Sequence, residues 1–358
     1  MKHRWFGVLL LLLLLNPASL WAQSVNDANP SAAALALGPG MLTVLPQDGR
    51  TLYFQAFDSA KREIVIEICV LEDPAILRHV QAALRRGVRV RAIVDQGKYE
   101  ALPSERTNLA RYLVGAGGQL HLSNPIFPRS FPKIILVDSS LLVYGSACLD
   151  TTTFMQYRDF ATTSRDPQIV RDLLNLFAND WSYSAAVGKK APAFNPTPPV
   201  TRPDLLISPV TSAARLVRLY QAAERTLDVY TELLGNPTLE SELAAAVKRG
   251  VRVRLIAPET VNGGTPDDQM LQRQSLSALA KAGVDVHVSG PDQTPQLPYM
   301  HARAAIVDGR IAFLGSISLS PDSITFNREM GLIFRNPLLV ASLQAQFRSD
   351  YRLRTSKF

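Results

Sequence analysis

Apolar runs that alternate with stretches of helical periodicity organise most of this chain. Residues 64–71 are apolar and rich in β-branched side chains, which is the pattern of a buried strand. Asp73-Pro74 then supplies a helix N-cap with proline at the first helical position. Residues at helical spacing and a terminating glycine complete the predicted helix: Ile76, Val80, Leu84 and Gly87. Residues 88–94 form the next predicted strand.

The second half of the chain repeats this order. Asn236-Pro237 begins a predicted helix, Gly250 ends it, and residues 251–256 form a strand. Each half also contains a predicted β-hairpin, with paired strands at 134–137 and 141–144, and at 304–307 and 311–314. Strands alternating with helices in this way predict an α/β architecture.

An internal duplication explains the repeated order. The hexapeptide Arg-Gly-Val-Arg-Val-Arg occurs identically at residues 86–91 and 249–254. Further matches, in the same order, pair 60–66 with 223–229, 116–123 with 282–289, 137–138 with 307–308, 145–146 with 315–316, and 157–159 with 327–329. The offset grows from 163 to 166 and then 170, as small loop insertions in the second half would produce. We therefore predict two similar lobes related by a pseudo-twofold axis, with a site where they meet.

Composition supports a division into two lobes. The 358 residues are 47% hydrophobic, enough for two domain-sized cores. We predict a first lobe over 42–188, an extended Pro-rich linker over 189–203 and a second lobe over 204–354.

The first 22 residues have the build of a secretory signal peptide. A basic start (Lys2, His3, Arg4) precedes an apolar run over 9–15, a break at Asn16-Pro17 and a small residue at Ala22. We therefore expect a periplasmic or secreted protein; a retained membrane anchor is the alternative. In such an oxidising compartment, Cys69 and Cys148 could pair, although the sequence leaves that bond open.

The net charge gives only a weak indication of the binding partner. The net charge is +7, and it is +5 once Lys2 and Arg4 are removed with the leader. A modest basic excess suits anionic partners such as phosphates, lipid headgroups or nucleic acid. The arginines of the repeated hexapeptide alternate with valine, so we expect them to line strand edges rather than bind nucleic acid.

Three short motifs occur in both halves and carry the candidate chemistry. The second half contains His301-Ala302-Arg303, then Asp308, then Gly315-Ser316; the first contains Phe131-Pro132-Lys133, then Asp138, then Gly145-Ser146. This pattern resembles the phospholipase D superfamily signature, His-x-Lys-x4-Asp followed by Gly-Ser-x-Asn. The resemblance covers nearly the whole chain after the leader. It implies two phospholipase D-like lobes, each a mixed sheet flanked by helices.

The resemblance also implies roles for individual residues. One histidine attacks phosphorus to form a phosphohistidine, and the other protonates the leaving alkoxide and later activates water. His301 would be the nucleophile and Glu329 would orient it, with Asp159 as the first-lobe counterpart of Glu329. The phosphate would be held by Lys133, Arg303, Ser146 and Ser316. Asp308 completes the motif and is grouped with His301 and Glu329 as the candidate catalytic set, and Asp138 is its first-lobe counterpart. For the aspartate of the motif itself we expect a structural role near the strand turn. No metal or other cofactor is implied.

The chain departs from the family pattern at its most important position. Phe131 stands where the first catalytic histidine belongs, and phenylalanine neither donates nor accepts a proton. Losing a general acid typically costs about 100- to 10,000-fold in rate. In addition, Arg303 replaces a lysine, and Cys148 and Ser318 replace the asparagines.

Two classes of function therefore remain open. The first is a metal-independent phosphodiesterase or phosphatidyltransferase, acting on phospholipids, with a nuclease of the same superfamily as an alternative. The second is a degenerate protein that binds phosphate or lipid without turnover. We expect contact with a membrane surface and a monomeric state. The remaining histidines are interpreted as structural (His121, His287) or solvated (His79), with His121 the one candidate to replace the missing acid.

Overall fold

The computed structural model describes residues 40–103, 112–195, 200–290, 294 and 296–356. The predicted leader (1–22) lies outside these residues, as do residues 196–199 of the predicted linker. No helix in the described part of the chain is long and apolar enough to cross a membrane.

The first lobe is one mixed sheet with helices on both faces. Along the chain it contains β1 (Thr43–Leu45), α2 (Thr51–Ser59), β2 (Glu63–Ile68), α3 (Pro74–Arg85), β3 (Arg89–Val94), α4 (Gln96–Glu100), β4 (Gln119–Leu122), β5 (Ser130–Phe131), β6 (Ile134–Val137), β7 (Leu141–Gly145), α6 (Thr151–Gln156), β8 (Tyr157–Ser164), α7 (Pro167–Tyr183) and β9 (Ala185–Ala186). The strand order is β1-β8-β7-β6-β2-β3-β4-β9.

The second lobe repeats this plan strand for strand. It contains β10 (Leu205–Ser208), α8 (Ser212–Gln221), β11 (Thr226–Tyr230), α9 (Pro237–Lys248), β12 (Arg252–Pro258), α10 (Pro266–Lys281), β13 (Asp285–Ser289), β14 (Tyr299–Met300), β15 (Arg303–Val307), β16 (Ile311–Gly315), α11 (Pro321–Thr325), β17 (Arg328–Phe334), α12 (Pro337–Leu353) and β18 (Thr355–Ser356). Its order, β10-β17-β16-β15-β11-β12-β13-β18, matches the first sheet position by position. The predicted duplication and α/β fold are confirmed.

Local signals explain why the predicted elements form. Asp73 accepts hydrogen bonds from the backbone N–H groups of Ala75 and Ile76, and Asn236 does the same for Leu239. Gly87 and Gly250 follow the two helices at φ 84° and 88°, a region that favours glycine. Both predicted hairpins form, as β6–β7 and β15–β16.

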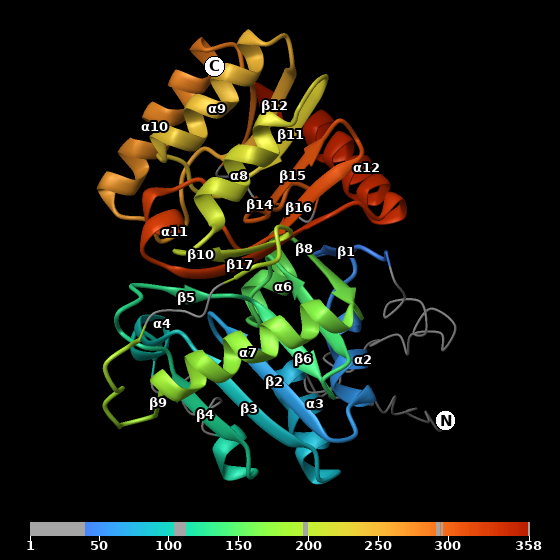
Figure 1. Cartoon of the computed structure of the whole chain (residues 1–358), viewed down its shortest axis with the longest axis vertical. Coiled ribbons are helices and arrows are strands. Elements are labelled where there is room, and N and C mark those ends of the chain that lie inside the picture. The colour runs from blue at the N-terminus through green and yellow to red at the C-terminus, as the bar shows by residue number, and fades with distance from the viewer. Residues whose placement is uncertain (1–39, 104–111, 196–199, 291–293, 295, 357–358) are drawn as a thin grey trace, which may run out of the picture.

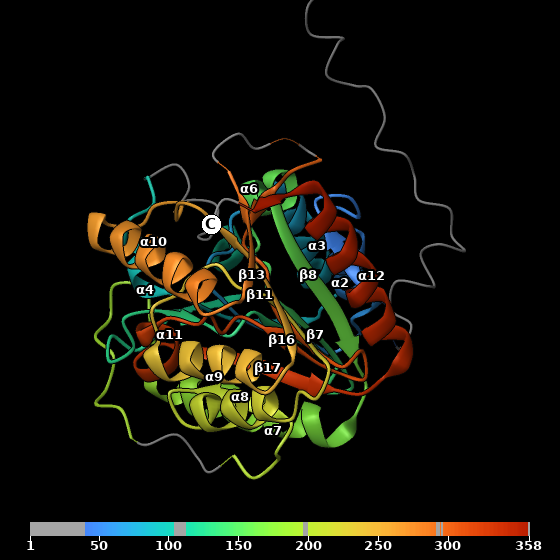
Figure 2. The same ribbon diagram turned by 90° about the horizontal axis from the view of Figure 1, so that it is seen from above.

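The two lobes share the core between them. Figure 1 shows the first lobe, in blue to green, stacked against the second, in yellow to red. The outer face of each sheet packs on its own helices, α2 and α3 in one lobe and α8, α9 and α10 in the other. The inner faces, with α7 and α12, contribute to one apolar cluster that crosses the interface. Figure 2 shows α12 of the second lobe running alongside β8 of the first.

Candidate active site at the lobe interface

Two very short strands cross from one lobe to the sheet of the other. β14, which immediately precedes His301, pairs in parallel with β8, so that Met300 lies opposite Arg158. β5, which carries Phe131, pairs with β17, so that Phe131 lies opposite Glu329. The exchange continues beyond the strands, because the backbone N–H of His301 donates to the Arg158 carbonyl at 3.2 Å. Each motif segment is therefore positioned by the opposite lobe.

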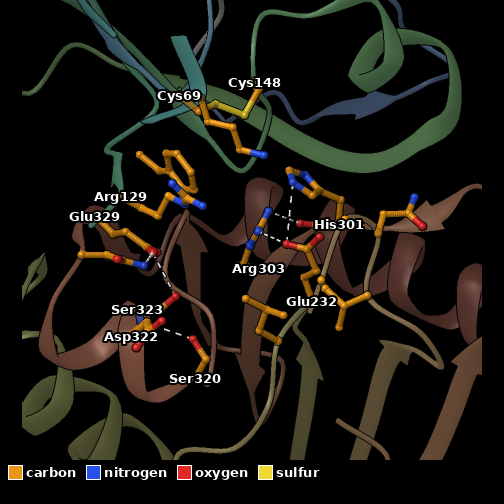
Figure 3. Close-up of a pocket in the computed structure, with 18 of the residues that line it drawn as sticks. Cys69, Arg129, Cys148, Glu232, His301, Arg303, Ser320, Asp322, Ser323 and Glu329 are labelled. Carbon is orange, nitrogen blue, oxygen red and sulfur yellow. Dashed lines mark hydrogen bonds and ion pairs between the residues drawn. A yellow bond between two sulfur atoms is a disulfide. The ribbon is translucent and has the colours of Figure 1, made fainter. Parts of the chain in front are cut away.

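A cavity of about 540 Å³ lies at this junction. Residues from both lobes line it, among them Phe131, Lys133, Glu232, His301, Arg303 and Glu329. Figure 3 shows His301, Arg303 and Glu232 together on one side of the cavity and Glu329 on another. The site expected where the lobes meet is present as a cavity.

His301 is held by Asp159 of the other lobe. Its Nδ1 lies 2.7 Å from Asp159 Oδ2, and the second oxygen of Asp159 accepts from Ser146 Oγ at 2.5 Å. Burial raises the pKa of Asp159 to about 6, an effect that Lys133 and Arg303 limit. Burial and then the Arg303 charge hold the pKa of His301 well below its usual range. A neutral ring donating from Nδ1 to a carboxylate leaves the lone pair on Nε2 available as a nucleophile.

The prediction that Glu329 orients His301 is therefore wrong. Glu329 Oε1 accepts instead from Ser323 Oγ at 2.9 Å and Asn327 Nδ2 at 3.1 Å. The reason is the strand exchange, which sets each carboxylate beside the motif of the other half. Glu329 faces position 131, where this chain has phenylalanine.

The two predicted phosphate-binding cations both line the cavity. Lys133 Nζ donates to the Ser146 carbonyl at 2.5 Å, and burial, followed by the charge of Arg303, lowers the pKa of Lys133 to about 7. Arg303 donates to Ser318 Oγ at 3.1 Å and to the His301 carbonyl at 2.5 Å. Two cationic side chains that line the cavity with His301 suit an anionic group that gains charge as it reacts.

The predicted phosphate-binding serines do not reach the cavity. Ser146 and Ser316 are both buried, and their hydroxyls accept from the backbone N–H of the adjacent strand, at Phe160 and Met330 respectively. Each follows a glycine at a very close approach: a Cβ on Gly145 would lie 2.0 Å from the Phe160 carbonyl oxygen. The serine hydroxyls therefore bond neighbouring strands to each other, and Ser146 contacts the site indirectly, through Asp159 and Lys133.

The motif aspartates are likewise structural, as the strand turn suggested. Asp308 accepts from the backbone N–H groups of Glu224, Arg225 and Thr226, and Asp138 makes the equivalent bonds to residues 61–63. Both sit in the left-handed region, at φ 51° and 52°. Asp308 does not line the cavity among the described residues, so its placement with the catalytic residues is corrected.

Glu232 is a cavity residue that the sequence reasoning missed. Its Oε2 forms an ion pair with Arg303 and lies 3.8 Å from His301 Nε2, and its Oε1 accepts from the Tyr299 hydroxyl at 3.0 Å. Although burial opposes it, the charges of Arg303, His301 and Lys133 bring the pKa of Glu232 below its usual range. The available signal was its position directly beyond a buried parallel strand, where ligand sites of α/β sheets gather.

A disulfide takes the corresponding place in the first lobe. Cys69 and Cys148 are joined, which settles the bond that the sequence left open, and both line the cavity. By the repeat, Cys69 corresponds to Glu232 and Cys148 to Ser318. The two halves of the site therefore differ at five matched positions of the first lobe, 69, 131, 133, 148 and 159, and the changes at 133 and 159 keep the charge.

The remaining histidines lie away from the cavity lining that the structure describes. His121 stacks on Trp181 and His287 on Tyr351, each with ring centroids 3.8 Å apart. His79 is partly covered, because it stacks on Phe54 and contacts Asp58 at 2.8 Å. Within the described ranges, no group of three or more His, Cys, Asp or Glu side chains could hold a metal ion.

Comparison with known proteins decides the family. The model of the "Cardiolipin synthase, PLD-like domain" family matches residues 53–181 and 216–351, most of both lobes. The chain belongs to the phospholipase D superfamily. It is 24% identical over 336 residues to cardiolipin synthase A of Pseudomonas syringae pv. syringae, covering 84% of this chain and 66% of that protein.

Other members of the superfamily are similar over parts of the chain or in fold. It is 35% identical to human mitochondrial cardiolipin hydrolase over 124 residues, covering 34% of this chain and 44% of that protein. Among solved structures, phosphatidylserine synthase of Haemophilus influenzae has the same fold, with a TM-score of 0.68, 14% identity, and 89% and 88% of the two chains covered. The chain spans about half the length of two further curated relatives. It covers 56% of a mitochondrial cardiolipin hydrolase of Chlamydomonas reinhardtii and 46% of a probable cardiolipin synthase of Bacillus subtilis.

Proposed function

We propose that this chain is a phospholipase D-type phosphodiesterase or phosphatidyltransferase that acts on phospholipids through a phosphohistidine at His301. The observation that carries the proposal is the neutral His301 ring, which buried Asp159 holds at Nδ1 in a cavity that Lys133 and Arg303 also line. The names of the Pseudomonas and Haemophilus relatives favour a phospholipid as the ester.

The proposed reaction proceeds in two displacements. His301 Nε2 attacks phosphorus while Lys133 and Arg303 stabilise the charge on the phosphoryl oxygens. Because Glu232 already neutralises Arg303, a phosphate oxygen competes with the Glu232 carboxylate for that guanidinium. Water then releases a phosphatidate, whereas an alcohol yields a new phosphodiester. The cations supply the positive charge, so the proposed mechanism uses no metal ion.

The proposal includes a location outside the cytoplasm and contact with a membrane. The sequence pattern of residues 1–22 and the Cys69–Cys148 disulfide support an oxidising compartment. Exposed apolar side chains support the membrane contact, because two of them directly precede cavity-lining residues: Met270 before Leu271, and Phe326 before Asn327. We expect the protein to act there as a monomer.

A search for the covalent intermediate tests the proposal. The purified protein is incubated with phospholipid vesicles labelled in the phosphatidyl group, quenched in alkali, which phosphohistidine survives, and analysed by mass spectrometry. We expect label on His301 and none in His301→Ala. A labelled single-stranded oligonucleotide, offered in parallel, tests the nuclease alternative.

Two results would contradict the proposed activity on phospholipids. No label and no turnover with either substrate, in protein shown to be folded and also in a Phe131→His variant, contradicts the enzyme and leaves a phosphate or lipid binder. Label from the oligonucleotide alone would reassign the substrate.

A further inference from the structure

Glu329 occupies an unusual position for a buried carboxylate. It is only 2% exposed and lines the cavity, yet its Oε2 has no hydrogen-bond partner among the described residues. An unpaired buried carboxylate oxygen is costly, so its persistence calls for an explanation.

Comparison with Asp159 explains the free oxygen. These two carboxylates occupy equivalent places in the two lobes, on β17 and β8. Both oxygens of Asp159 are used, one by His301 and the other by Ser146. The position beside Glu329 that corresponds to His301 is Phe131, whose ring offers no donor. Loss of the histidine has left Glu329 with an oxygen available for chemistry.

We propose that Glu329 is a catalytic residue that replaces the absent histidine, protonating the leaving alkoxide and then deprotonating the attacking water or alcohol. This role rests on the proposed function of His301. Figure 3 shows Glu329 across the cavity from His301, the arrangement that in-line displacement requires of nucleophile and acid.

The protonation state suits this role. Burial raises the pKa of Glu329 to about 7, against the opposing influence of Arg303. A general acid–base group works best when its pKa lies near the working pH. Glu329 therefore holds its proton in part of the population at neutral pH and releases it readily.

The other candidates fit poorly. Glu232 is held ionised, and its two oxygens are occupied by Arg303 and the Tyr299 hydroxyl. His121, the alternative suggested by the sequence, stacks on Trp181 and does not line the cavity.

Bonds and protons balance in both steps. In the first, the bond from His301 Nε2 to phosphorus forms, the bond to the leaving oxygen breaks, and that oxygen takes the Glu329 proton to depart as an alcohol. In the second, Glu329 takes a proton from water, the water oxygen bonds to phosphorus, and the bond from phosphorus to Nε2 breaks, with its electron pair returning to Nε2. The enzyme ends in its starting state.

Leaving-group chemistry provides the test. Wild type and Glu329→Gln are compared on a phospholipid, whose alkoxide needs protonation, and on a p-nitrophenyl phosphodiester, whose phenolate does not. We expect the variant to lose about 100- to 10,000-fold in kcat/KM on the phospholipid. On the nitrophenyl ester it should release one equivalent of nitrophenolate in a burst and then stall with label on His301, because the second step lacks its base.

Two further variants control for indirect effects. Asp322→Asn removes another cavity-lining carboxylate and should leave both rates unchanged. Adding Phe131→His to Glu329→Gln should recover at least part of the phospholipid activity, because the imidazole supplies the missing acid. Thermal unfolding confirms that each variant is folded.

The outcomes separate this role from the proposed function. A wild type that turns over both esters, with a folded Glu329→Gln that matches it, or that loses equally in kcat/KM on both esters and gives no burst of nitrophenolate, overturns the role of Glu329 alone. A wild type that turns over neither ester overturns the proposed function together with this role.

Discussion

The ionisable groups around the cavity show how one physical cause, burial, acts in opposite directions. It raises the pKa of the Asp159 carboxyl to about 6 and of the Glu329 carboxyl to about 7, and it lowers the pKa of the Lys133 ammonium to about 7. Groups whose ordinary values are far apart are thereby brought together near neutrality. A site of this kind should respond sharply to pH.

We expect kcat/KM to follow a bell-shaped pH profile. Below about pH 6 Asp159 gains a proton and no longer holds His301 as the tautomer with a free Nε2, so the rate falls. Above about pH 7 the protonated Glu329 and Lys133 are lost, so the rate falls again. The limbs report the coupled cluster rather than single residues. Initial rates measured from about pH 4.5 to about pH 9 give the profile. A flat curve would contradict the pKa directions assigned to Asp159, Glu329 and Lys133.

At the level of elements, local sequence signals were sufficient for the long helices and strands. Caps such as Asp73 and Asn236 and β-branched runs such as β2 act within a few residues, so a single sequence displays them. The strands β5 and β14 have only two residues each, and their pairing partners lie in the other lobe. No local pattern marks such strands, which is why the partner of His301 was assigned to the wrong carboxylate.

The motif residues show the same limit. Spacing identified His301, Lys133 and Arg303 correctly as cavity residues. It could not show that the Ser146 and Ser316 hydroxyls turn towards a neighbouring strand, because that depends on the close approach at the preceding glycines. Nor could it show Glu232, whose counterpart in the repeat is a cysteine.

The disulfide links two loops of the first lobe at the cavity, and we expect it to stabilise the fold. The bond closes a long loop, since Cys69 and Cys148 are 79 residues apart. Replacing both by serine should lower the free energy of unfolding by about 2–4 kcal/mol. Urea denaturation measures the change. Reductant should destabilise wild type and leave the double variant unaffected; equal stability of the two proteins without reductant would contradict the expectation.

At the scale of the whole molecule, two matched ion pairs join the lobes beside the site. Arg158 of β8 contacts Asp350 of α12 at 2.9 Å, and Arg328 of β17 contacts Asp180 of α7 at 2.8 Å. Arg158 directly precedes Asp159, which holds His301, and Arg328 directly precedes Glu329, which lines the cavity. The residue that fixes the interface and the residue that serves the site are therefore neighbours on one strand.

Breaking one of these pairs should destabilise the protein strongly. Arg158→Met leaves Asp350 buried with fewer partners, for which we expect a loss of about 3–5 kcal/mol in the free energy of unfolding. Arg89→Met is the matched control, because Arg89 pairs with Glu63 at 3.0 Å but its side chain is 67% exposed, and it should change stability little. Chemical denaturation measures both changes. If the two substitutions lower the free energy of unfolding equally, the interface pair stabilises the protein no more than the exposed pair does.

The exchange of β5 and β14 between the lobes also constrains how this protein can evolve. Position 131 lies opposite position 329, and position 301 is bonded to position 159. Each of these pairs contains one residue from each half of the internal duplication. The residues of each pair should therefore depend on each other among relatives. In a relative with histidine at position 131, the glutamate at 329 would no longer transfer the proton. The pair formed by 159 and 301 should be retained in both cases. A substitution in one half therefore changes the surroundings of a residue in the other half, as Phe131 does for Glu329.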